Sequence, residues 1–112
     1  MDRFEEICKQ AVQFRDERDW GQFHNPKDLA ISCALEAAEL LETFQWSGGD
    51  LVCADKLEEQ TDELADVMLY CLLLADRLGI DPLDAMERKL EKNRAKYPVE
   101  KAFGRSAKYT EL

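Results

Sequence analysis

The chain has 112 residues with 24 acidic and 15 basic side chains, which give a formal net charge of −9. This length suits one domain with one core, and 46% apolar with 35% charged residues is typical of a folded globular protein. The acidic balance argues against binding to nucleic-acid polymers or anionic membranes, which need a basic surface, but a bound cation would still admit a small phosphate ligand.

The sequence shows no export or membrane signal. Its first ten residues are charged and lack an apolar core segment, and the longest apolar run, residues 67–75, is too short to cross a bilayer. The cysteines form no C-x-x-C pair, which argues against zinc. Their aliphatic or small neighbours predict buried free thiols at Cys8, Cys33, Cys53 and Cys71. We therefore expect a cytoplasmic protein.

Helix signals occur along the whole chain, and no alternating β-branched run predicts a strand. The first helix is expected over residues 2–18. Asn25, Pro26 and Asp28 supply an N-cap, a proline at the first helical position and an acid in the first turn. They predict a second helix over residues 26–45.

Glycines and prolines delimit the other helices. The pair at 48 and 49 ends the second helix, and the third is expected over residues 54–78, before Gly79. Asp81 and Pro82 begin a fourth helix over residues 82–96, which ends at the proline at 98. We expect residues 99–112 to be an irregular polar tail, and residues 1–112 to be a single all-α domain.

The third predicted helix is apolar on every side. At about 100° per residue one face collects Leu57, Thr61, Leu64, Met68, Cys71, Ala75 and Leu78. Leucines at 69, 72, 73 and 74 occupy the other sides, and a helix that is apolar all round is buried all round. We therefore expect a homo-oligomer in which a second subunit covers the remaining surface. The alternative is that the other helices and the tail suffice.

Two acidic pairs, Glu36 with Glu39 and Glu63 with Asp66, lie in apolar surroundings. Such spacing is common in an acidic chain, and its ordinary interpretation is a solvated helix face. Glu36, however, lies at the margin of an apolar stripe, where a lone ionised carboxylate is costly to desolvate. Acids persist there when they are paired, protonated or bound to metal. If the two helices are neighbours, the four carboxylates converge and repel one another unless cations lie among them.

Oxygen ligands of this kind favour hard divalent cations, and Mg²⁺ keeps coordination positions open for phosphates. No histidine lies near either pair, which argues against the Glu-x-x-His pattern of a di-iron bundle. The only histidine, His24, precedes the second predicted helix. From spacing alone, a metal site and a salt-bridged structural cluster both remain open.

The order of these motifs resembles the MazG-like family of all-α nucleoside triphosphate pyrophosphohydrolases. Glu36-x-x-Glu39, then twenty-three residues, then Glu63-x-x-Asp66 matches that family's signature. Other stretches resemble its dCTP pyrophosphatase branch: ERDWGQFHNP at 17–26, FQW at 44–46, NRAKYP at 93–98 and KYTEL at 108–112. The likeness covers nearly the whole chain. A short loop at residues 47–53 departs from the family and puts the mouth of its pocket in doubt.

The resemblance implies a four-helix MazG-like bundle that assembles as a tetramer, a dimer of dimers. It also implies Mg²⁺-dependent hydrolysis of a (deoxy)nucleoside triphosphate, dCTP or a modified dCTP, to the monophosphate and pyrophosphate. Glu36, Glu39, Glu63 and Asp66 would hold the metal, and Glu36 would activate water. The same chemistry on dATP or dUTP is an alternative.

The resemblance also suggests substrate contacts, each with a structural alternative. Trp20, Trp46, Tyr70 and His24 would contact the base or sugar; the alternatives are core packing for the first three and a surface position for His24. Lys89, Asn93, Lys96 and Tyr97 would contact the substrate, and the three at helical spacing would otherwise form a solvated basic face. Two other classes stay open: a non-enzymatic helical assembly module with a structural acidic cluster, and a metal-binding bundle without hydrolase activity.

Overall fold

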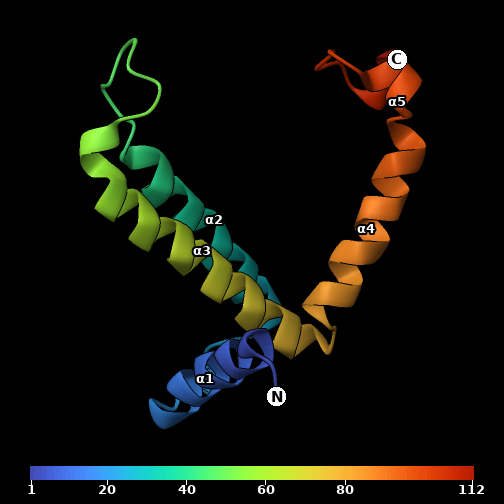
Figure 1. The fold of residues 1–112 in the computed structure, drawn as a ribbon. Coiled ribbons are helices and arrows are strands. Elements are labelled where there is room, and N and C mark those ends of the chain that lie inside the picture. The colour runs from blue at the N-terminus through green and yellow to red at the C-terminus, as the bar shows by residue number, and fades with distance from the viewer. The chain divides into compact units, whose positions relative to one another are not determined.

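The computed structural model describes residues 1–112 and contains helices and turns but no strands (Figure 1). It divides into two compact units, Met1–Gly79 and Ile80–Leu112. The first unit holds α1 (Arg3–Glu17), α2 (Pro26–Glu42) and α3 (Leu57–Leu78), and the second holds α4 (Pro82–Lys96) and α5 (Val99–Ala102). None of these helices combines the length and apolar character needed to span a bilayer. The expected all-α class is confirmed.

Local hydrogen bonds explain where the helices begin. Asp2 and Glu5 form a reciprocal capping box at the start of α1, with the Glu5 N–H donating to Asp2 Oδ1 over 2.8 Å. Asn25 Oδ1 accepts from the Asp28 N–H over 2.9 Å, and Pro26 occupies the first position of α2. Asp81 caps α4 in the same way. These helices begin where the sequence predicted, because capping residues act within one turn of the chain.

The structure differs from the prediction mainly at the ends of helices. α2 ends at Glu42 rather than at residue 45, because residues 43–46 form turns. α3 begins at Leu57 rather than at residue 54, because Ala54–Lys56 is a short 3₁₀ helix. The tail contains α5 and a 3₁₀ helix at Tyr109–Glu111, so its prediction as wholly irregular was wrong.

The first unit is built on an antiparallel pair, α2 and α3, which lie side by side over most of their length (Figure 1). α1 packs against α3 near the end of the pair where α3 finishes. The hydrophobic core of this unit consists of Ala11, Leu29 and Leu73, one residue from each helix, and Leu29 is fully buried. Tyr70 and Leu74 pack against this core. A few apolar contacts therefore hold three helices together.

Two polar contacts made by the last turn of α3 supplement this small core. Arg15 of α1 is 5% exposed, and its Nη1 donates to Asp76 Oδ2 over 2.8 Å. Arg77 Nη2 donates to the Gly21 carbonyl oxygen over 2.9 Å, in the 3₁₀ turn Trp20–Gln22 that follows α1. α3 thus holds both α1 and the turn after it.

Most of the heptad face of α3 is exposed. Leu57, Leu64, Met68 and Leu78 are all at least half exposed, whereas Ala75 of the same face and Leu73 are buried. α2 adds further exposed aliphatic side chains, among them Leu35 and Leu41. The side of α3 that packs inside the chain is the one that carries Tyr70 and Leu73.

The prediction of four buried thiols was wrong for three of them. Only Cys53 is buried; Cys8 and Cys33 are half-buried and Cys71 is exposed. Cys71 belongs to the mostly exposed heptad face of α3. Its Sγ lies 4.0 Å from that of Cys33 on α2.

The second unit consists of α4 and a tail that folds back on the end of this helix. The rings of Tyr97 and Tyr109 meet edge to face with centroids 6.1 Å apart, and Lys96 Nζ lies 4.8 Å from the centroid of the Tyr109 ring. Arg105 Nη2 donates to the Glu111 carbonyl oxygen over 3.3 Å. Tyr109 therefore anchors the tail.

Replacing Leu29 by alanine should destabilise the chain strongly. The side chain is fully buried between three helices, and such truncations cost about 2–5 kcal/mol. Urea unfolding followed by circular dichroism measures the change. Leu51→Ala is the matched control, since Leu51 is 83% exposed in the loop before α3, and it should change the free energy of unfolding by less than about 0.5 kcal/mol. Equal effects of the two substitutions would contradict this core.

Candidate metal centre and adjoining cavity

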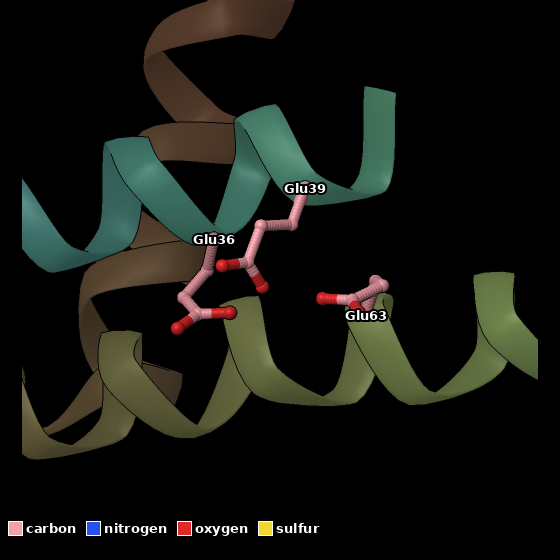
Figure 2. Close-up of side chains that lie close together, drawn as sticks. All are labelled: Glu36, Glu39 and Glu63. Carbon is pink, nitrogen blue, oxygen red and sulfur yellow. The ribbon is translucent and has the colours of Figure 1, made fainter. Parts of the chain in front are cut away.

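Three of the four predicted carboxylates converge between α2 and α3. Glu36, Glu39 and Glu63 each place a carboxylate oxygen within 4.8 Å of the others. Figure 2 shows the two side chains of α2 directed toward that of α3. Spacing of three residues puts Glu36 and Glu39 on one face of α2, and the antiparallel pairing brings Glu63 opposite them. The convergence predicted from the sequence is therefore present for these three residues.

Two of the carboxylates have an oxygen that is withdrawn from water and has no partner. One oxygen each of Glu36 and Glu63, Oε2 in both, is buried and accepts no hydrogen bond. Leaving such an atom unpaired costs free energy, and it costs more when the group is charged. A proton or a cation between the carboxylates would remove this cost.

The pKa values of the cluster show the same crowding. Burial, followed by the hydrogen bond with Glu39 and the charges of Glu39, Asp66 and Glu63, raises the pKa of Glu36 to about 6. The pKa of Glu63 is also raised, first by its hydrogen bond with Glu39 and then by burial and neighbouring negative charge. Simultaneous ionisation of Glu36 and Glu63 is therefore disfavoured.

Asp66 lies outside this converging set but close to it. It follows Glu63 by three residues on α3, and its negative charge contributes to raising the pKa of Glu36 and of Tyr70. Asp66 and Glu36 border the same cavity. Its role as a fourth ligand stays a prediction.

A cavity of about 450 Å³ adjoins the carboxylates and is mostly apolar. Trp20, His24 and Tyr70 line it, together with Glu36 and Asp66. The aromatic residues form a chain of contacts: the ring centroids of Trp20 and His24 lie 6.3 Å apart, as do those of His24 and Tyr70. Three residues predicted to contact a base or sugar are therefore gathered beside the acidic cluster.

His24 is a neutral group in this wall. Burial, and then the positive charges of Arg15 and Arg77, lowers its pKa, which favours the uncharged imidazole at neutral pH. Its Nδ1 is buried and has no hydrogen-bond partner in the protein. It therefore lacks the polar partner that a buried ring nitrogen normally has.

Trp46, which belongs to the same unit, does not line this cavity. Trp46 is 92% exposed, in a turn after α2 where its φ is 67°. Lys89, Asn93, Lys96 and Tyr97 belong to the second unit. Within that unit Lys89 and Lys96 are exposed, Asn93 is half-buried, and Tyr97 packs on Tyr109.

Sequence reasoning missed the contribution of α1. Gln10, Phe14 and Arg15 line the cavity, and the Phe14 and Trp20 rings meet edge to face with centroids 5.6 Å apart. Ile7, Ala11 and Phe14 recur at helical spacing, and an arginine directly follows this stripe. That pattern was the available signal for a wall built from the first helix.

Comparison with known proteins gives consistent relatives. A model of the MazG-like family matches residues 31–112. dCTP pyrophosphatase 1 of Mus musculus is 36% identical and that of Homo sapiens 37% identical to this chain over 113 residues. Each of these alignments covers 96% of this chain and 66% of the relative, so the chain spans just under two thirds of their length. The crystal structure of a pyrophosphatase from Archaeoglobus fulgidus matches with a TM-score of 0.80 and 42% identity, over 88% of this chain and 94% of that chain.

These likenesses confirm the resemblance first indicated by the acidic motifs. The segment matched by the family model contains Glu36, Glu39, Glu63 and Asp66, and it extends through α4 and the tail. It makes up well over half of the sequence. The chain belongs to the MazG-like family.

Proposed function

We propose that the chain is a nucleoside triphosphate pyrophosphohydrolase that requires Mg²⁺ and acts on dCTP or a modified dCTP. The observation that carries this proposal is the convergence of Glu36, Glu39 and Glu63, with two unpartnered buried oxygens, beside a cavity with aromatic walls. The relatives named as pyrophosphatases support the reaction type, and the name of the mouse and human proteins suggests the base.

The residues present fit a hard divalent cation. All the converging donors are carboxylate oxygens, which Mg²⁺ prefers, and no thiol or imidazole is among them. Glu36, Glu39 and Glu63, with Asp66 beside them, would hold the ion. When bound, Mg²⁺ neutralises the charge of the triphosphate and of the phosphoryl-transfer transition state.

The protein's own groups would position water and substrate. Glu36 would orient the attacking water and accept its proton. The water oxygen forms a bond to the α-phosphorus as the bond to the pyrophosphate oxygen breaks. No covalent intermediate on the protein is needed, because positioning and charge stabilisation supply most of the catalysis.

The cavity would hold the nucleoside. The aromatic faces of Trp20 and Tyr70 suit a base and a deoxyribose, and His24 would offer Nδ1 to one of them. The resemblance assigns Lys89, Asn93 and Lys96 to the phosphates, and it makes Tyr97 a further substrate contact. Trp46 lies outside the cavity, and its stacking on the base stays a prediction.

A homo-oligomer, with a tetramer as its expected form, is part of the same proposal. Leu35, Leu57, Leu64 and Met68 leave much apolar surface of α2 and α3 exposed, and surfaces of this kind are usually covered in an assembly. A cytoplasmic location would place such an enzyme beside the nucleotide pool.

A panel of nucleoside triphosphates with Mg²⁺ tests the reaction. We expect equal amounts of monophosphate and pyrophosphate, with the highest kcat/KM for dCTP or a 5-substituted dCTP. Chromatography of the nucleotides, with separate assays for pyrophosphate and orthophosphate, measures this. Release of orthophosphate would contradict the proposed bond cleavage. If no triphosphate is hydrolysed, the result would favour the alternative that the chain is a helical assembly module with a structural acidic cluster.

Neutralising single carboxylates should abolish turnover without unfolding the helices. Glu39→Gln and Asp66→Asn each remove one ligand charge, which should lower kcat by on the order of 100-fold or more. Glu58→Gln is the matched control, because Glu58 lies in the first turn of α3, is exposed and is outside the cluster. It should keep full activity. Near-normal rates for both cluster variants would refute the metal assignment.

The stability of the metal-free chain should depend on the protonation of Glu36. Its folded-state pKa of about 6 lies above the ordinary value of 4.5, so folding favours the protonated form. The resulting stabilisation is present below about pH 4.5 and is lost as the pH rises through 6. In urea titrations with a chelator, the free energy of unfolding should therefore fall over this range relative to that of Glu36→Gln. A difference between the two proteins that stays constant with pH would disprove the effect.

A further inference from the structure

A buried arginine borders the cavity without belonging to the acidic cluster. Arg15 is 5% exposed and lines the cavity from α1. Its Nε lies 2.9 Å from Asp16 Oδ1, and its Nη1 lies 2.8 Å from Asp76 Oδ2. Two carboxylates thus compensate the charge of the guanidinium and fix its plane.

The guanidinium keeps a donor free. It carries five N–H groups, and its hydrogen bonds to Asp16 and Asp76 come from Nε and Nη1. Nη2 makes neither of these two hydrogen bonds. Arg15 is one of the residues that line the cavity. A ligand there would meet a donor already held in place.

Arg15 and the carboxylates lie at different levels along α3. Asp66 and Asp76 lie ten residues apart on α3, which corresponds to a rise of about 15 Å. Tyr70 and Leu73 line the cavity between these levels. A nucleotide with its phosphates at Glu36 and Asp66 would pass its sugar over Tyr70 and bring its base to Arg15.

We propose that Arg15 is a specificity-determining residue that donates hydrogen bonds to acceptor atoms on the base edge, with Asp76 as its positioning residue. This inference rests on the proposed function and names the group that selects its substrate. A guanidinium only donates, so it suits an edge with adjacent acceptors, such as O2 and N3 of cytosine. A base without acceptors on this edge would leave the Arg15 donor unpaired in an apolar cavity. The binding of such a base is therefore disfavoured.

The test measures nucleoside binding without Mg²⁺, so it does not depend on hydrolysis. Two probes are titrated into isotope-labelled protein by chemical-shift mapping: 2′-deoxycytidine, and a deoxynucleoside whose base is a non-polar isostere without acceptors. Arg15→Met keeps the length of the side chain but removes its donors. It should weaken deoxycytidine binding by about 10- to 100-fold and leave the affinity for the isostere unchanged.

Arg77→Met is the matched control. It removes the neighbouring hydrogen bond between α3 and the Gly21 carbonyl oxygen, and so shows how a looser contact between α3 and this turn affects binding. The affinities for both probes should fall slightly and by the same factor. Asp76→Asn keeps the guanidinium but weakens its orientation, and it should lower the preference for deoxycytidine by a smaller factor. It also keeps the test open if Arg15→Met fails to fold.

An unchanged preference between the probes in folded Arg15→Met and in Asp76→Asn would overturn the inference. So would equal losses in Arg15→Met and Arg77→Met, or no binding of deoxycytidine to the unaltered chain. Pyrophosphate release by the unaltered chain is scored separately. Its presence together with an unchanged preference would reject the role of Arg15 alone, and its absence would reject the proposed function.

Discussion

The repulsion between three carboxylates held between α2 and α3 is the constraint on which the rest of the structure depends. Two buried oxygens without partners and a Glu36 pKa of about 6 show that the cluster opposes the pairing of its own helices. The contact of Leu29 with Ala11 and Leu73 keeps the helices together in spite of this repulsion. A site that is costly when empty is one that gains most when a cation enters it.

The cavity exists because α1 crosses the end of this helix pair. α3 presents Asp66, Tyr70 and Leu73 along one side, while α1 and the turn after it present an opposing wall that includes Phe14 and Trp20. α3 therefore contributes both a charged residue and apolar residues to the lining of the same cavity. These parts of the lining differ chemically, so a ligand with a charged end and a flat polar ring would lie in one direction only.

Much of the site was predictable because its signals are local. The caps at Asn25 and Asp81 set helix starts, and acids three residues apart on one helix face the same way wherever the helix packs. The exposure of most of the heptad face of α3 was not predictable, since a helix that is apolar all round does not indicate which side its own chain will cover. Nor was the contact of Arg15 with Asp76, which joins residues 61 positions apart. The turns after α2, which leave Trp46 exposed, are closed by local hydrogen bonds such as that from the Phe44 N–H to the Leu41 carbonyl oxygen.

The modest attachment of α1 has a consequence for access. α2 and α3 pack along their lengths, whereas α1 is held by Ala11, the ion pair of Arg15 with Asp76 and the neighbouring turn. Detaching α1 therefore costs less free energy than separating the helix pair. Local unfolding of this one helix would open the aromatic wall to solvent while the carboxylates stay assembled. Entry and exit of a ligand would then need no hinge and no dismantling of the charged centre.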